Sequence, residues 1–457
     1  MSADVTTSPA AAALPAWRDP AAWAKAADIF AVLIALSLPW STSLVAIFAV
    51  ALLVAMAPFL DVRAFLSSLK RPICALPIAL FALAIFGTFW SDAPWGARLY
   101  AIGPTTKLLL LPLLFYHFER SARGMQVFIA FLVSCTLLMV MSWIVAFDPS
   151  LSLKPKVEIS RGIFVKNYID QSQEFGLCAV ALAYPIITFL RTKRILLAAL
   201  LIAIAMSFVV NMAFVVVSRT ALVTIPVMLA VFALLHLNWR SIVMILCVTT
   251  IFGGVAWQMS PQLRATVATF SRDYQLYSEQ NTSTSIGQRL EFWKKSLRFF
   301  AEAPILGHGT GSTRGLFEQA AVGQVGAAAE IIGNPHNQTL NVAVQWGVIG
   351  IVLLYAMWLL HLLLFRGDGL VAWIGLLVVV QNIFSSLFNS HLFDFHEGWM
   401  YVLGVGVAGG IMLKTSSREA ASGPGDPSNP GGRHAGGRSS VFSRRLNPEM
   451  LCYRSAK

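Results

Sequence analysis

The stretch ILLAALLIAIAMSFVVNMAFVVV, residues 195–217, decides the class of fold. It carries no charged side chain, and Ser207 and Asn211 are its only strongly polar members. About 20 apolar residues in one helix cross the hydrocarbon core of a bilayer, because the segment then satisfies its own backbone hydrogen bonds. Similar apolar runs recur along the 457-residue chain. The sequence therefore predicts an all-α polytopic membrane protein.

Composition supports this class. The chain is 57% hydrophobic and 12% charged, whereas soluble globular proteins carry about 25% charged residues. It contains no Walker loop, no Gly-x-Ser-x-Gly and no Asp-x-Asp pair of the kind that holds a metal-bound nucleotide sugar. We therefore expect no nucleotide donor, no cofactor and no nucleic-acid partner.

Apolar runs and their flanks predict about twelve transmembrane helices. The fourth is short for a full crossing, which predicts a tilted or partly interfacial segment. The predicted limits are 28–42, 43–60, 72–90, 105–117, 125–147, 174–191, 195–217, 220–237, 241–258, 335–364, 370–388 and 398–414.

Loop charges predict the orientation. The loops after the second, fourth, sixth, eighth and tenth spans carry Lys or Arg and fall on one side, which the positive-inside rule makes cytoplasmic. Residues 1–27 and the Ser-, Gly-, Pro- and Arg-rich tail 415–457 are then cytoplasmic, and we expect the tail to be disordered and to touch anionic lipid. The opposite side carries the loop 148–173, within the first nine spans (28–258), and a larger loop, 259–334, which precedes the last three spans (335–414).

This opposite side is unexpectedly basic, since 14 of the 34 Lys and Arg residues lie on or near it. A solvated loop surface is one interpretation, and an outward-facing site for a phosphate-bearing ligand is the other. The large loop also contains an amphipathic segment, 288–302, in which aromatic and basic residues alternate, so we expect a helix in the headgroup plane. The 14 residues are Arg98, Lys107, Lys154, Lys156, Arg161, Lys166, Arg219, Arg264, Arg272, Arg289, Lys294, Lys295, Arg298 and Arg314.

The sequence IIGNPHNQ, residues 331–338, enters the tenth span. Asn334 is a good N-cap and Pro335 suits the first helical position, which predicts that His336 lies in the first turn. The positive end of a helix favours the neutral imidazole, the form that accepts a proton. The alternative is a polar cap on a membrane helix.

Two arginines stand at predicted helix starts. Arg219 lies between two apolar runs with almost no loop, and Arg289 begins the amphipathic segment. A guanidinium at a helix start suits a phosphate group. The alternatives are a snorkelling side chain at Arg219 and an interfacial charge at Arg289.

A short outer loop, 389–397, gathers His391, Asp394, His396 and Glu397. These are metal-ligand types, but their spacing matches no metal signature that we know. We therefore expect no metal site and favour a polar cap near the outer cavity.

These features together resemble the O-antigen ligases of Gram-negative bacteria and, more broadly, the O-antigen ligase/polymerase superfamily. The resemblance covers most of residues 28–414. It rests on the large loop between late spans, the Arg-Leu-Glu-Phe-Trp segment at 289–293, the Gly-His-Gly turn at 307–309 and the Asn-Pro-His-Asn motif at 334–337. The motifs separate ligase from polymerase less well than they indicate the superfamily.

The resemblance implies a glycosyl transfer at the periplasmic face of the inner membrane. The donor would be O-antigen polysaccharide on undecaprenyl diphosphate, and the acceptor a sugar hydroxyl of the lipid A-core. It implies metal independence and a fold similar to the C-type membrane glycosyltransferases. The family's important histidine and two arginines map onto His336, Arg219 and Arg289. Further candidates for substrate binding are Lys107, Arg161 and Lys166, which suit acceptor phosphates, together with His308, Asn334, Asn337 and Gln338.

Other functions remain open from sequence. An O-antigen polymerase would share the donor and the motifs and differ only in its acceptor. A flippase or other transporter of lipid-linked glycans would need polar residues along the membrane interior, whereas the predicted spans are mostly apolar.

Overall fold

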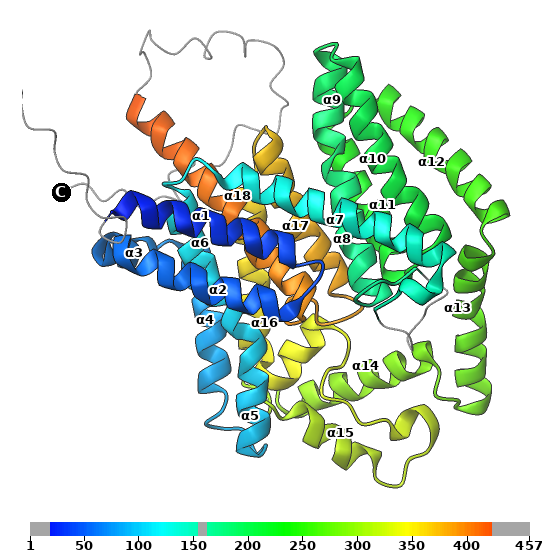
Figure 1. Ribbon diagram of the computed structural model, residues 1–457. Coiled ribbons are helices and arrows are strands. Elements are labelled where there is room, and N and C mark those ends of the chain that lie inside the picture. The colour runs from blue at the N-terminus through cyan, green and yellow to red at the C-terminus, as the bar shows by residue number, and fades with distance from the viewer. Residues whose placement is uncertain (1–18, 154–161, 423–457) are drawn as a thin grey trace, which may run out of the picture.

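The computed structural model describes residues 19–153 and 162–422, and within these ranges every regular element is a helix. The α-helices pack side by side in a bundle, and α13, α14 and α15 gather at one end of it (Figure 1). The first seven α-helices are α1 (Pro20–Ser37), α2 (Thr42–Met56), α3 (Val62–Ser68), α4 (Pro72–Phe86), α5 (Trp95–Ile102), α6 (Leu110–Phe118) and α7 (Gly124–Phe147).

The remaining α-helices follow the loop that contains residues 154–161. They are α8 (Tyr168–Ala181), α9 (Ala183–Arg191), α10 (Ile195–Phe214), α11 (Arg219–His236), α12 (Trp239–Met259), α13 (Pro261–Gln280), α14 (Ser285–Glu302), α15 (Thr313–Ala321), α16 (Gln338–Leu364), α17 (Leu370–Ser385) and α18 (Phe395–Ser422). Short 3₁₀ turns connect several of them, at Ala57–Phe59, Gly103–Leu109, Pro149–Leu151 and Gly326–Ala329.

All twelve predicted spans fall on helical segments, so the chain is an all-helical polytopic membrane protein. Nine helices or continuous helical segments of the described ranges are long and apolar enough to cross a membrane, or ten if the bent pair α3–α4 forms one span. The predicted short span 105–117 belongs to the longer segment Trp95–Phe118, because α5, a 3₁₀ turn and α6 follow one another directly. The residues before 105, with Arg98, Gly96, Gly103 and Pro104, interrupt the apolar pattern, so the sequence did not reveal the full length of this segment.

Small residues bring the last helix into the centre of the bundle. α18 packs against α6 and α17. A Cβ atom at Gly409 would lie 2.2 Å from the ring of Phe115, and one at Gly406 would lie 2.6 Å from Leu114. Membrane helices approach closely at such positions because dispersion contacts, rather than the hydrophobic effect, hold them together. This packing fixes the loop between α17 and α18 at the site described below.

The large loop is more helical than the sequence predicts. The amphipathic segment forms α14 as expected, but α13 follows α12 with only Ser260 between them. The Ser260 hydroxyl accepts a hydrogen bond from the Leu263 amide at 3.1 Å and so caps α13. α14 buries Phe292 and Phe299 against Phe317 of α15 and against α16, so its aromatic face packs on protein.

The Gly-His-Gly turn inserts into a break in α16. Gly347 has φ +59° and ψ −153°, which interrupts the helix and frees its carbonyl groups. The amides of His308 and Gly309 donate to the carbonyls of Val344 and Gln345, each at 2.9 Å. In return, the Val348 amide donates to the Pro304 carbonyl at 2.8 Å. Main-chain hydrogen bonds therefore join the large loop to a membrane helix.

Candidate active site

The Asn-Pro-His-Asn motif forms a tight loop rather than the predicted first helical turn. The N-cap of α16 is Asn337, whose side chain accepts a hydrogen bond from the Leu340 amide at 3.1 Å, so the prediction of Asn334 as N-cap is wrong. Asn334 instead accepts the His336 amide at 3.0 Å in a local turn. His336 lies before the helix with φ +53°, a left-handed conformation that Asn, Asp and His tolerate better than most residues. Such a turn competes with helix formation, because a short amide side chain can accept the hydrogen bond of a nearby backbone amide in place of a helical carbonyl.

A chain of side-chain hydrogen bonds orients the His336 ring. The Nδ1 atom lies 2.8 Å from Oδ1 of Asn389, and Nδ2 of Asn389 donates to Oδ2 of Asp394 at 2.6 Å. Because this amide donates to the carboxylate, its oxygen must accept from the ring, which places the proton of neutral His336 on Nδ1. The Nε2 atom then carries the free lone pair. His336 is thereby prepared to accept a proton at Nε2.

The environment also keeps His336 neutral. Burial lowers the pKa of His336 below its usual value, and the positive charge of Arg289 lowers it further, while the hydrogen bond to Asn389 acts in the opposite direction. The ring of Phe292, one helical turn after Arg289, lies 6.1 Å from the His336 ring between centroids. α14 therefore places a cation and an aromatic surface beside the same imidazole.

Arg219 and Arg289 line one cavity of about 220 Å³. The first residues of α8, α11 and α14 all line it, so the positive N-terminal ends of these three helices lie at the same cavity. Its lining is Tyr168, Ile169, Val217, Ser218, Arg219, Thr220, Gln262, Ala265, Thr266, Thr269, Ser285 and Arg289.

The two arginines differ in their partners. Arg219 forms an ion pair with Asp273 at 3.0 Å and also hydrogen bonds to Thr269, both on α13. Arg289 makes no hydrogen bond or ion pair with any of the described residues. Burial and the neighbouring charge of Arg219 lower the pKa of Arg289, because two cations share a partly desolvated space. An anion in this cavity would relieve that repulsion and would give Arg289 a partner.

The structure brings together the three residues predicted as catalytic, but it places several predicted substrate-binding residues in structural contacts. Lys107 is buried and donates to the carbonyls of Phe393 and Asp394, so it holds the α17–α18 loop. Lys166 is buried, 3.5 Å from Glu174. Arg161 lies outside the described residues.

The other predicted substrate-binding residues also serve the loops. His308 Nε2 lies 2.8 Å from the Phe299 carbonyl, in the Gly-His-Gly turn, and does not line the arginine cavity. Asn337 caps α16 and donates to the Leu387 carbonyl at 3.2 Å. Gln338 accepts the Leu392 amide at 3.1 Å. These contacts tie the start of α16 to the loop before α18.

Sequence reasoning missed the residues that support the three predicted ones. Asn389, which orients His336, is the first residue of the loop 389–397. The many acidic and His residues of this loop were the available signal. The signal for Asp273, the partner of Arg219, was weaker, because α13 was not recognised as a helix beside α11.

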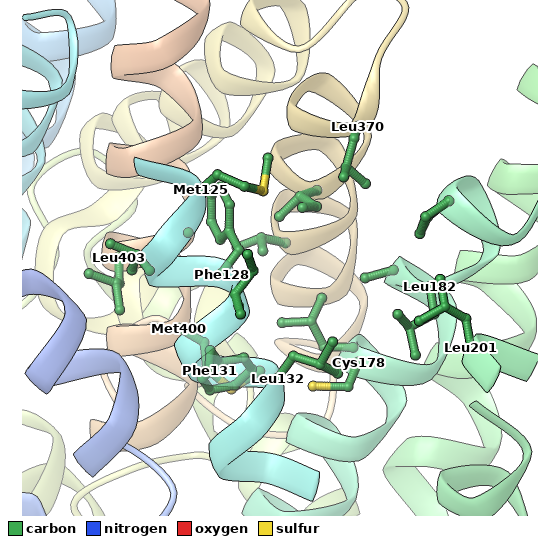
Figure 2. Close-up of a pocket in the computed structure, with 18 of the residues that line it drawn as sticks. Met125, Phe128, Phe131, Leu132, Cys178, Leu182, Leu201, Leu370, Met400 and Leu403 are labelled. Carbon is green, nitrogen blue, oxygen red and sulfur yellow. The ribbon is translucent and has the colours of Figure 1, made fainter. Parts of the chain in front are cut away.

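A second cavity, of about 420 Å³, lies among the membrane helices and is almost wholly apolar. Figure 2 shows Met125, Phe128 and Leu132 of α7 opposite Cys178 and Leu370, with Met400 and Leu403 of α18 along one side. A wall of hydrocarbon side chains suits a lipid chain.

Fold and site together define a helical membrane protein with a basic cavity beside a neutral histidine. Residues 204–355 match the family model described as O-antigen ligase, and this stretch runs from within α10 to within α16 and includes all three residues. The chain is also 28% identical over 144 residues to a Haemophilus influenzae protein named "Uncharacterized protein". That match covers 30% of this chain and spans 36% of the relative's length.

Proposed function

We propose that the protein is an O-antigen ligase. It transfers O-antigen polysaccharide from undecaprenyl diphosphate to a sugar hydroxyl of the lipid A-core at the periplasmic face of the inner membrane, and no metal ion takes part in the step. The observation that carries the proposal is the Arg289 guanidinium, which has no hydrogen-bond or ion-pair partner among the described residues and lines the same cavity as Arg219, close to His336. The superfamily match over residues 204–355 supports it.

The proposed step is a single displacement. Arg219 and Arg289 bind the diphosphate and stabilise the charge that develops as it leaves. The acceptor oxygen forms its bond to the anomeric carbon while the bond from that carbon to the diphosphate oxygen breaks, and His336 Nε2 takes the hydroxyl proton. The diphosphate departs with the bonding electrons, and the anomeric configuration inverts. The apolar cavity of Figure 2 would accommodate part of the donor's hydrocarbon chain.

The test is transfer by the purified protein, in EDTA, with lipid-linked O-antigen and lipid A-core. We expect lipopolysaccharide of increased mass from the wild type, and a loss of about 10²-fold or more with His336→Ala, since a positioned base contributes roughly that much. Arg289→Lys keeps the charge but not the planar pair of donors, and we expect it to lose most activity as well. His236→Ala is the control, because that ring packs at the far end of α11 between Phe232 and Trp373.

Three outcomes would change the assignment. Longer glycan chains on the donor lipid, with no transfer to lipid A-core, would identify a polymerase. Near-full transfer by His336→Ala would remove the role of base from that residue. No glycan transfer of either kind would overturn the enzyme assignment and favour a transporter.

A further inference from the structure

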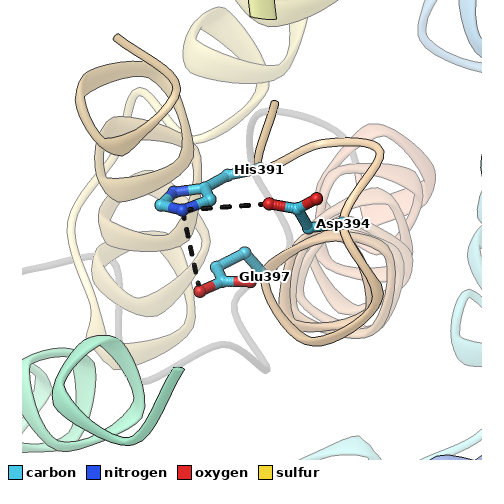
Figure 3. A group of neighbouring side chains, drawn as sticks. All are labelled: His391, Asp394 and Glu397. Atoms are coloured by element: carbon cyan, nitrogen blue, oxygen red, sulfur yellow. Dashed lines mark ion pairs between the residues drawn. The ribbon is translucent and has the colours of Figure 1, made fainter. Parts of the chain in front are cut away.

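Three side chains that could bind a metal ion, His391, Asp394 and Glu397, lie close together near the candidate active site. His391 Nε2 lies 4.0 Å from Oδ2 of Asp394 and 3.9 Å from Oε1 of Glu397, and the three atoms all lie within 4.8 Å of one another. Figure 3 shows the ring and both carboxylates pointing toward one common space. The loop between α17 and α18 supplies two of these residues, and the first turn of α18 supplies Glu397.

The distances within this cluster leave its polar atoms without hydrogen bonds to one another. Separations of 3.9 and 4.0 Å exceed hydrogen-bond length. The side chains of His391 and Glu397 are only 1% and 6% exposed, and Glu397 Oε1 has no hydrogen-bond partner. A buried carboxylate oxygen without a partner is costly, so its direction toward an imidazole and a second carboxylate calls for a cation between them.

The nearest ammonium group does not fill that space. Lys107 attracts both carboxylates electrostatically, but its Nζ atom donates to the main-chain carbonyls of Phe393 and Asp394. It therefore fixes the loop backbone and leaves the carboxylate oxygens that face His391 without its protons.

We propose that His391, Asp394 and Glu397 bind one divalent transition-metal ion, for which Zn²⁺ is the best match. One imidazole and two carboxylates are ligands that Zn²⁺ accepts, with water as the fourth. Atoms that each lie about 2.1 Å from one Zn²⁺ are roughly 3.4 Å apart in a tetrahedron. The two separations from His391 Nε2, 4.0 and 3.9 Å, would each shorten by about half an ångström on metal binding.

The surroundings of the cluster resemble those of metal ligands. Ligating carboxylates are usually held by a further hydrogen bond, and Asp394 accepts Nδ2 of Asn389 at 2.6 Å. The ion would join the loop to the first turn of α18. None of its three ligands lines the arginine cavity, and Asp394 acts on the proposed proton transfer only through its hydrogen bond with Asn389. The metal site can therefore exist whether or not the proposed function is correct.

The experiment measures metal binding without any substrate. The full chain, purified in detergent without a histidine tag, is stripped with chelator, equilibrated with Zn²⁺ or Mn²⁺ and analysed for bound metal. We expect about one tightly bound Zn²⁺ per wild-type chain, and affinity at least tenfold lower for His391→Gln and for Glu397→Gln. His236→Gln and Glu302→Gln are the matched controls, and we expect both to bind as the wild type does.

Thermal unfolding provides the second measurement. An ion that binds only the folded state raises its melting temperature, so Zn²⁺ should stabilise the wild type and both controls but neither ligand variant. If His391→Gln does not fold, the test relies on Glu397→Gln and on whether Zn²⁺ raises the melting temperature of the wild type. Far less than one bound ion per wild-type chain at saturation, or equal affinity in the wild type and a folded ligand variant, would overturn the proposal.

Discussion

At the scale of single residues, two hydrogen bonds hold His336 in an unfavourable backbone conformation. A left-handed backbone costs an ordinary residue about 1–2 kcal/mol, and His336 has φ +53°. The hydrogen bonds of its amide to Asn334 and of its ring to Asn389 hold it there. The sequence contains two good capping residues three positions apart, and local propensity could not decide which of them begins α16.

The pH dependence of transfer follows from the same residue. Because burial lowers the pKa of His336 below its usual 6.5, the imidazole is lost as a base only as the pH falls through this lowered pKa. Arg289, Asn389 and the neighbouring His391 face this ring. We therefore expect kcat/KM, whose pH dependence reports the free enzyme, to rise with pH and to reach half its plateau below pH 6.5.

The Arg289→Gln variant tests whether the pH dependence comes from His336. Arg289→Gln removes the nearby positive charge, so the pKa of His336 should rise and the midpoint of the residual activity should move to higher pH. The measurement is the normalised rate of transfer between pH 4.5 and 8.5, a range of about two units on each side of the usual histidine pKa. A wild-type midpoint well above pH 7, or a midpoint that ignores Arg289→Gln, would contradict the assignment of His336 as base.

At the scale of elements, the broken helix α16 and the Gly-His-Gly turn depend on each other. Gly347 has φ +59°, and a Cβ atom there would lie 2.3 Å from the Ile305 carbonyl oxygen. A side chain at this position would strain the backbone and push the turn out of the break. The apolar pattern of the span predicts a helix at 335–364, but nothing in that pattern indicates an interruption.

We therefore expect Gly347→Ala to destabilise the protein by more than about 1 kcal/mol. The matched control is Gly253→Ala in α12, where no atom lies within 4 Å of the added methyl group, so stability should be unchanged or slightly higher. Thermal unfolding of both variants in detergent measures the difference. Equal melting temperatures would show that the turn does not require the break.

At the scale of the whole molecule, apolar segments and loop charges predict the order of the helices well, because each span is a local property of the sequence. They do not predict which distant segments meet. Asn389 lies 53 positions from His336, and Arg219 lies 54 positions from Asp273. Such pairs depend on the packing of whole helices, which leaves no local periodicity in the sequence.

The predicted orientation can be tested on intact cells. We expect the large loop to face the periplasm and the α9–α10 connection to face the cytoplasm, because basic short loops stay inside. A cysteine introduced at the exposed Glu318 of α15 should react with a membrane-impermeant maleimide, and one at Lys193 only after the cells are opened. The parent chain, whose Cys247 is exposed, gives the background. Labelling of both positions in intact cells, or of Lys193 alone, would refute the orientation.

Main-chain hydrogen bonds join the Gly-His-Gly turn of the large loop to the break in α16, and this joint affects which substitutions the chain can accept during evolution. Peptide groups make its hydrogen bonds, and a peptide group is the same whatever side chain it carries. Substitutions that preserve the backbone path therefore leave these main-chain bonds intact. The glycines do not allow such substitutions, since added atoms at Gly307 and Gly309 would each lie 2.5 Å from a neighbouring main chain. A survey of tolerated substitutions should accordingly find Gly307 and Gly309 invariant, while His308, whose amide makes one of these bonds, tolerates other side chains as far as the bonds are concerned.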